Sequence, residues 1–167
     1  PEEGLAYTRM LAEKWGNDPL VNILVQPHSL YTCSPALNQA AKKIADEYNL
    51  MLGIHLLENQ SELRELQEKF GEDGVPFLER IGYLDERLHA FHCVCLSDYD
   101  IKLFAKYGCK VSHHPASNMK LASGISPVPD MLKAGITVGL GTDGCASNNT
   151  LDMIREMSTA AKLHKVA

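Results

Sequence analysis

Apolar runs typical of buried β-strands alternate with amphipathic stretches along the 167-residue chain. The longest apolar run covers residues 50–57 and indicates a strand that is buried on both faces. Four further strands are expected at residues 21–26, 88–96, 109–112 and 136–141. Five strands separated by helical segments predict an α/β fold built on a parallel sheet.

Local capping signals place helices between the expected strands. Ser34 and Pro35 form a favourable N-cap followed by proline at the first helical position. Ser97 and Asp100 have the spacing of a capping box, which predicts a helix that extends to Gly108. Further helices are expected near residues 61–70 and 75–81, after Ser126-Pro127, and after Asn149-Thr150. The last of these has an expected apolar face formed by Leu151, Ile154, Met157 and Ala161.

Composition and short motifs argue against several classes of protein. A net charge of −5 without a basic block disfavours a protein that binds the phosphate backbone of nucleic acids. No apolar run is long enough to cross a membrane. The five cysteines are odd in number and form no CxxC pair, so a disulfide framework is not expected. Cysteines without disulfides favour a cytoplasmic location. The absence of GxGxxG after the first strand favours a (β/α)8 barrel over a dinucleotide-binding sheet.

Each expected strand ends in a histidine or a carboxylate. In parallel barrels the carboxyl ends of the strands meet at one face, where active sites form. Imidazoles together with a carboxylate suit a divalent metal of the zinc or iron type, and a separate carboxylate is then needed to move protons. The strand-end residues are His28, His55 with Glu58, His92, His113 with His114, and Asp143.

Taken singly, each of these residues also has a structural explanation. A lone histidine at a strand end is often hydrogen-bonded within the fold, and Asp143 could cap the glycine-rich turn at residues 141–144. Cys93 and Cys95 would share one strand face, where buried structural cysteines are commoner than metal ligands. The catalytic interpretation therefore depends on the joint placement of the polar residues.

Five segments resemble motifs of the amidohydrolase superfamily. They are PHSLYTCS at residues 27–34, IHLLE at 54–58, HCV at 92–94, SHHPASNMKL at 112–121, and GLGTDG at 139–144 followed by ASNN. The likeness runs from about residue 20 to the end of the chain and is greatest to the 5′-methylthioadenosine/S-adenosylhomocysteine deaminase and chlorohydrolase-like branch. It implies a TIM-type (β/α)8 barrel to which this chain contributes about strands 4 to 8.

The resemblance also implies a role for each residue of the site. His55 and Asp143 would bind the metal, which is expected to be zinc, with iron as the alternative. Glu58 would shuttle protons to the purine ring, and His92 would orient the attacking hydroxide, so that Glu58, His92 and Asp143 are the expected catalytic residues. His28 would contact the sugar or its 5′ substituent, which makes His28 and Glu58 the substrate-binding residues. The implied reaction is hydrolytic loss of ammonia from C6 of an adenine-type nucleoside.

Four features depart from the family pattern. Cys95 stands where the family often has His, and Asn59 stands where it commonly has Thr. His114 stands where the family usually has Asn. No His-x-His pair is present, although the family uses one on its first strand to supply two metal ligands. Residues 1–167 are therefore expected to be a fragment of a metal-dependent hydrolase barrel domain. We expect the fragment to be inactive alone, and to be completed by the rest of the barrel or to form a homo-oligomer.

Two other functions stay open at this point. A chlorohydrolase or aminohydrolase of triazine or guanine-like rings would use the same scaffold and differ chiefly in its pocket. A non-catalytic half-barrel is the second alternative, which the complete set of polar strand ends disfavours. The expected partner is a small nucleoside-like molecule, with no nucleic acid and no membrane.

Overall fold

Five parallel strands form one sheet in the computed structural model, which describes residues 2–166. The strands lie in chain order, and each pairs in parallel with the next. Consecutive βα units of a barrel produce this arrangement, so the fold is part of a (β/α)8 barrel, as the sequence predicts. The strands are β1 (Leu24–Val25), β2 (Met51–Leu56), β3 (Leu88–His92), β4 (Lys110–His113) and β5 (Thr137–Leu140).

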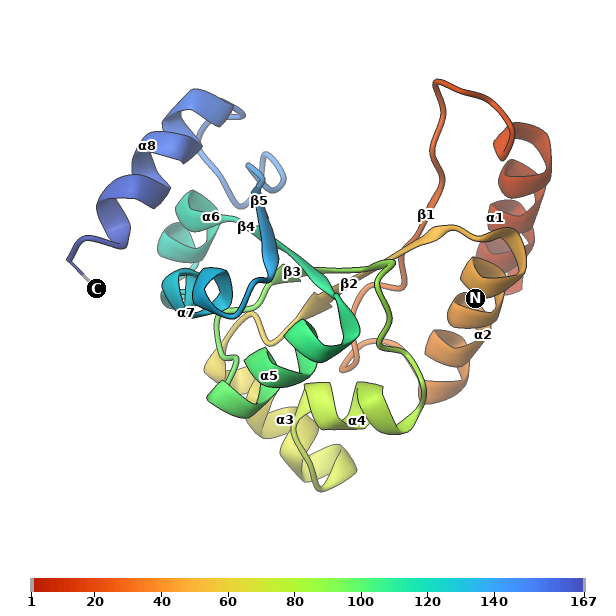
Figure 1. Ribbon diagram of the computed structural model, residues 1–167, viewed down its shortest axis with the longest axis horizontal. Coiled ribbons are helices and arrows are strands. Elements are labelled where there is room, and N and C mark those ends of the chain that lie inside the picture. Colours follow the sequence, from red (N-terminus) through yellow and green to blue (C-terminus); the bar gives the residue numbers. More distant parts are fainter. Residues whose placement is uncertain (1, 167) are drawn as a thin grey trace.

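Helices cover one side of this sheet and both of its flanks. Helices α3, α4, α5 and α7 lie below the sheet in Figure 1, α1 and α2 lie beside β1, and α6 and α8 lie at the opposite flank. Within residues 2–166, none of them is both long and apolar enough to cross a membrane. Their bounds are α1 (Glu2–Trp15), α2 (Pro35–Tyr48), α3 (Gln60–Phe70), α4 (Gly74–Arg80), α5 (Asp98–Tyr107), α6 (Pro115–Lys120), α7 (Val128–Lys133) and α8 (Met153–Leu163).

The two faces of the sheet differ in burial. Leu52, Ile54 and Leu56 of β2 are buried against the helices. Met51 and His55 of the same strand are only partly buried, because no helix lies over their face of the sheet in Figure 1. The expectation of burial on both faces therefore holds for the helix side only. The uncovered face corresponds to the interior of a closed barrel.

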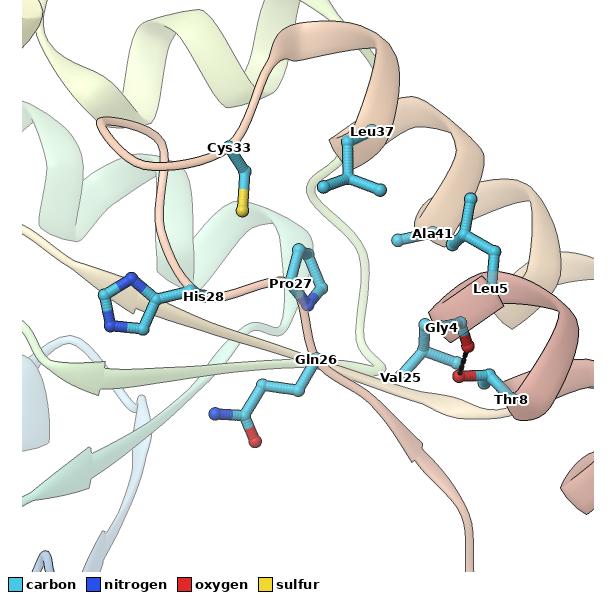
Figure 2. A pocket seen from close by; sticks show the side chains of 10 residues that line it. All are labelled: Gly4, Leu5, Thr8, Val25, Gln26, Pro27, His28, Cys33, Leu37 and Ala41. Atoms are coloured by element: carbon cyan, nitrogen blue, oxygen red, sulfur yellow. Dashed lines mark hydrogen bonds between the residues drawn. The ribbon is translucent and has the colours of Figure 1, made fainter. Parts of the chain in front are cut away.

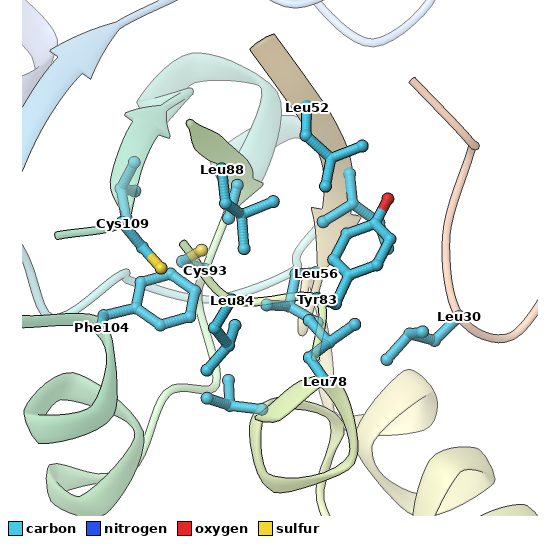
Figure 3. Close-up of a cluster of buried hydrophobic side chains, with 14 of the residues drawn as sticks. Leu30, Leu52, Leu56, Leu78, Tyr83, Leu84, Leu88, Cys93, Phe104 and Cys109 are labelled. Atoms are coloured by element: carbon cyan, nitrogen blue, oxygen red, sulfur yellow. The ribbon is translucent and has the colours of Figure 1, made fainter. Parts of the chain in front are cut away.

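The hydrophobic core lies between the sheet and helices α3 to α5. Leu52 and Leu56 of β2 pack with Leu88 of β3, and the rings of Tyr83 and Phe104 complete the cluster (Figure 3). Each of these side chains is at most 1% exposed, and burying one contributes about 1.5–3 kcal/mol. The core therefore fixes β2 and β3 in the register that brings Leu56 beside His92 at their carboxyl ends.

The two strongest capping signals are confirmed. Ser34 Oγ accepts a hydrogen bond from Leu37 N at the start of α2. Ser97 and Asp100 form a complete capping box at α5, which ends at Gly108 in the left-handed conformation. These local contacts explain why both helices begin where the sequence predicts.

Other elements depart from their expected bounds. Strand β1 has two residues instead of six, because it is an edge strand that pairs only with β2. Strand β3 ends at His92, where φ turns to 68° and leaves the extended region. The last helix is capped by Asp152, whose carboxylate accepts hydrogen bonds from Ile154 N and Arg155 N, and not by Asn149-Thr150. Helix α6 was not expected at all.

Candidate active site

The polar strand ends gather along one edge of the sheet. His28 follows β1, His55 lies near the end of β2, and His92 is the last residue of β3. The ring centroids of His28 and His55 are 4.9 Å apart, and those of His55 and His92 are 5.5 Å apart. His114, directly after β4, continues the row with its centroid 4.6 Å from that of His92. Four successive strands thus bring one imidazole each to the same edge.

His55 is oriented by the backbone of the neighbouring strand segment. Its Nδ1 donates a hydrogen bond to the carbonyl oxygen of His28 at 2.9 Å. The ring packs against Phe91 on the other side, with centroids 5.3 Å apart. A histidine whose Nδ1–H is held by a carbonyl presents Nε2 as a lone-pair donor, which is the arrangement that metal-binding histidines use. His55 therefore has the tautomer that a ligand needs.

His92 is buried and held by a side-chain amide. Its Nδ1 lies 2.9 Å from Asn118 Oδ1, and an amide oxygen can only accept, so Nδ1 carries the proton. Both His92 and Cys93 have positive φ, at 68° and 51°. Two successive non-glycine residues in the left-handed region are strained, and such strain concentrates at functional sites.

Asp143 follows β5 and accepts three hydrogen bonds. Ser117 Oγ and Ser147 Oγ both donate to Oδ2, at 2.5 and 2.7 Å, and Gly144 N donates to Oδ1 at 2.7 Å. Burial alone would raise the pKa of this carboxyl, but the three donors and the nearby His92 outweigh burial and lower its pKa to about 2. Asp143 is therefore a carboxylate at neutral pH. The expected turn cap at residues 141–144 is present as well, because Gly144 N is one of the donors.

Glu58 lies on a turn that a second carboxylate holds. Glu62 Oε1 accepts a hydrogen bond from Leu57 N at 3.0 Å, and Oε2 accepts one from Glu58 N at 2.8 Å. Leu57 has a φ of 50°, so the turn is strained and needs this support. Burial raises the pKa of Glu62 to about 7, even though both amides lower it. The Glu58 carboxylate accepts no hydrogen bond from any other residue in the range 2–166, which leaves it available for a ligand.

His28 borders a cavity of about 270 Å³ between α1, β1 and α2. Figure 2 shows its ring turned away from the apolar walls formed by Leu5, Leu37 and Ala41. Among the polar strand ends, His28 borders this cavity, whereas His55 and Asp143 do not. The ring of His28 is exposed, and its Nδ1 lies 2.7 Å from Thr32 Oγ1.

The two histidines at the end of β4, His113 within the strand and His114 directly after it, lie apart, which corrects the expectation that both join the strand-end cluster. His113 is fully buried on the helix side, with its Nε2 3.2 Å from His164 Nε2. His114 stays on the edge, and its Nε2 lies 2.8 Å from Ser112 Oγ. Burial lowers the pKa of each ring to about 4, so both are neutral at pH 7.

One group of side chains within residues 2–166 has the spacing of a metal site. Ligand atoms of His92, His114 and Asp143 all lie within 4.8 Å of one another. Two imidazoles and a carboxylate are donors that fit a divalent metal ion. His55 borders this group through His92, and its assignment as a ligand stays a prediction. Cys93 does not belong to the group and is fully buried, which agrees with a structural cysteine.

Three buried polar residues of the site were not predicted. Ser117 and Asn118 lie within a motif that the sequence already singles out, but no local rule says what they bond to. Glu62 stands four residues after Glu58 and resembles an exposed helix residue until the turn is built. Their partners come from other strands or from a strained turn, so spacing along the chain does not reveal them.

Comparisons with known proteins agree with this geometry. The chain is 60% identical over 166 residues to 5-methylthioadenosine/S-adenosylhomocysteine deaminase 1 of Syntrophus aciditrophicus. It is 46% identical to the 5′-deoxyadenosine deaminase of Methanopyrus kandleri. Each alignment covers 99% of this chain and 38% of the relative, so the chain spans well under half the length of these relatives.

Solved structures give the same result. An adenosine deaminase from Xanthomonas campestris with bound zinc superposes with a TM-score of 0.94 and 37% identity, covering 96% of this chain and 37% of that one. The atrazine chlorohydrolase of Arthrobacter aurescens, solved with zinc, gives a TM-score of 0.82 and 28% identity, covering 88% and 33%. The family model described as "Amidohydrolase family" matches residues 2–167. The chain therefore belongs to the amidohydrolase family.

Proposed function

We propose that the protein of which this chain forms part hydrolytically deaminates adenine-type nucleosides. The observation that carries the proposal is the row of strand-end residues in which His55 and His92 both have Nδ1 engaged and Asp143 is held as a carboxylate. The same edge carries Glu58 on its supported turn. The identity of 60% to a methylthioadenosine/S-adenosylhomocysteine deaminase supports the choice of substrate class.

The proposed roles follow from the chemistry of each side chain. Asp143 and His55 are the metal ligands proposed for this chain. Of the group with metal-site spacing, only Asp143 is thus proposed as a ligand, and His92 has another role. A divalent ion, when bound, lowers the pKa of a water molecule and makes it nucleophilic at neutral pH. Glu58 carries a proton to the purine ring nitrogen, and His92 directs its Nε2 at the attacking oxygen. His28, with its exposed ring, contacts the sugar or its 5′ substituent.

We propose zinc as the ion. Imidazole nitrogen and carboxylate oxygen are donors that zinc accepts readily, and iron accepts them too. The adenosine deaminase that superposes at a TM-score of 0.94 contains zinc, which supports this choice. Metal analysis of the purified full-length protein distinguishes the two, because a stoichiometric iron content would replace zinc in the proposal.

The decisive experiment measures ammonia release by the full-length protein that contains this chain. The substrates to compare are adenosine, methylthioadenosine, S-adenosylhomocysteine and 5′-deoxyadenosine. Atrazine and guanine are tested separately as substrates of the alternative function. We expect turnover of at least one adenine nucleoside and no turnover of atrazine or guanine. Turnover of the triazine or of guanine alone would replace the proposal with the chlorohydrolase-like alternative. The lower identity of 28% to the atrazine chlorohydrolase disfavours that result.

We also infer a cytoplasmic enzyme whose site is completed outside this chain. All five cysteines are free, which suits a reducing compartment. The sheet has two edge strands, β1 and β5, each with one neighbour among residues 2–166. Strands from the rest of the barrel are the proposed occupants of both edges, and a homo-oligomer of the full-length protein is the further expectation. Sedimentation of the full-length protein tests the oligomer.

A further inference from the structure

Helix α6 (Pro115–Lys120) places two adjacent, fully buried side chains against two different strand ends. Ser117 Oγ donates to Asp143 Oδ2 at 2.5 Å, after β5. Asn118 Oδ1 accepts from Nδ1 of His92 at 2.9 Å, at the end of β3. Neighbouring residues of one short helix thus hold the two groups that stand on either side of β4.

Both groups need such support because their backbones are strained. His92 has a φ of 68° and Asp143 a φ of 61°, and neither is glycine. A left-handed non-glycine residue persists only where its surroundings hold it. Ser126 also stabilises the backbone next to His92, since its Oγ donates to the carbonyl oxygen of Cys93 at 3.0 Å.

Helix α6 is itself fixed by a buried carboxylate from α8. Glu156 is 1% exposed, and its Oε2 accepts a hydrogen bond from Ala116 N at 3.2 Å, in the first turn of α6. Its Oε1 accepts one from Asn148 Nδ2 at 2.7 Å. The same Nδ2 donates to the carbonyl oxygen of Thr142, the residue before Asp143. One carboxylate therefore ties α6 to the loop that carries Asp143.

We propose that Ser117 and Asn118 are positioning residues that hold Asp143 and His92 in a fixed mutual orientation, with His92 Nε2 left as the proton acceptor. This inference rests on the proposed function, which gives His92 and Asp143 their tasks. The tautomer follows from the partner: the Asn118 oxygen keeps the proton on Nδ1, so Nε2 carries the lone pair. The orientation of the Asp143 carboxylate follows in part from Ser117, whose hydroxyl fixes Oδ2 together with that of Ser147. Oδ1 accepts only from Gly144 N, which leaves it a lone pair for a metal ion.

The test uses the full-length protein with Asn118→Leu, Asn118→Asp and Ser117→Ala. Met119→Ala is the control, because Met119 is the next residue of the same helix and is 56% exposed. Asn118→Leu removes the acceptor, and we expect kcat to fall about 10- to 100-fold with little change in KM. Asn118→Asp keeps an oxygen acceptor at the same place, so it should recover most of this loss. Ser117→Ala should weaken zinc binding about 10- to 100-fold, and Met119→Ala should match the parent.

Two readouts do not depend on turnover. The ¹⁵N chemical shifts of His92, assigned with His92→Gln, report which ring nitrogen carries the proton. The zinc dissociation constant reports whether Ser117 orients the Asp143 carboxylate for metal binding. An active parent with unchanged kcat, tautomer and zinc affinity in Asn118→Leu and Ser117→Ala would overturn the positioning roles. A parent without deaminase activity, but with the expected shifts in tautomer and zinc affinity, would instead overturn the proposed function and leave the positioning roles standing.

Discussion

At the scale of single residues, the site is built from strained positions and the side chains that hold them. Leu57, His92 and Asp143 all have φ between 50° and 68°. Each of them forms a hydrogen bond with a buried polar side chain. Leu57 N donates to Glu62, His92 donates to Asn118, and Asp143 accepts from Ser117. Candidate chemistry could be predicted from residue types at strand ends. The strain could not, because it depends on contacts between distant parts of the chain.

A pair of substitutions in the full-length protein separates metal binding from proton transfer. Glu58→Gln should retain the metal and lose ~10²–10⁴-fold in kcat, because it removes an ionisable proton carrier and no ligand. His55→Ala should lose metal, since the ring presents Nε2 to the site. Metal content and steady-state kinetics of both variants provide the measurement. The opposite pattern, an empty Glu58→Gln protein and a fully loaded His55→Ala protein, would reverse the two assignments.

At the scale of elements, local signals predicted most helices, and long-range contacts decided the rest. Helices with a side-chain cap in sequence, such as those after Ser34 and Ser97, begin where expected. Helix α6 has six residues and no apolar periodicity, so nothing in its own sequence indicates it. The helix expected after Ser126-Pro127 is present as α7, but Ser126 does not cap it, because its hydroxyl donates to the carbonyl oxygen of Cys93, directly after β3. A serine cannot be assigned to a cap when a buried acceptor competes for it.

The packing of Gly141, directly after β5, against the end of β4 leads to a prediction at this scale. A Cβ on Gly141 would lie 2.7 Å from Nε2 of His114 and 3.2 Å from Ser112 Oγ. Gly141→Ala should therefore displace the His114 ring and destabilise the protein by about 1–3 kcal/mol. Chemical denaturation measures the loss. The double variant with His114→Ala removes the obstructing ring, so it should recover part of that stability; an equal loss in the double variant would exclude this contact as the cause.

At the scale of the whole molecule, buried histidines should set the response to acid. The pKa of His113 falls from 6.5 to about 4 on burial, with a smaller contribution from His164. A lowered folded-state pKa means that the unfolded chain binds the proton first as pH drops below 6.5. The contribution of His113 to folding stability is therefore fully present above pH 6.5 and is lost as the pH falls towards 4. The loss at pH 5 is on the order of 2 kcal/mol for this one group.

The variant His113→Gln isolates this effect. It should lower stability at pH 8 but lose less between pH 8 and pH 5 than the parent does. Val111→Ala, on the same strand and equally buried, supplies a destabilised control without a titrating group. Denaturation at both pH values gives the comparison. Glu62 acts in the opposite direction, because its pKa is raised to about 7, and it does so equally in all three proteins. An unchanged pH dependence in His113→Gln would exclude the buried imidazole as a source of acid sensitivity.

The 167-residue chain on its own carries surfaces that a closed barrel would cover. Strands β1 and β5 each leave one edge unpaired within residues 2–166. Ile154, Met157 and Ala161 of the expected apolar face lie on α8, whereas Leu151 lies before the helix begins. Ile154 is 73% exposed and Met157 is 55% exposed. The sequence therefore identified this face in part, and it could not reveal what covers it. Unpaired strand edges and exposed apolar surface both promote association between chains.

We therefore expect the isolated chain to self-associate and to lack deaminase activity, because the His-x-His pair expected to complete the metal site is absent from it. Light scattering across a wide concentration range, with metal analysis and the ammonia assay, measures all three properties. Ile154→Glu should reduce association, since it places a charge on the exposed apolar face. Lys102→Glu, on the exposed side of α5, introduces the same residue elsewhere and should leave association unchanged. A stable monomer that holds one zinc ion and releases ammonia would show that these five strands suffice for catalysis.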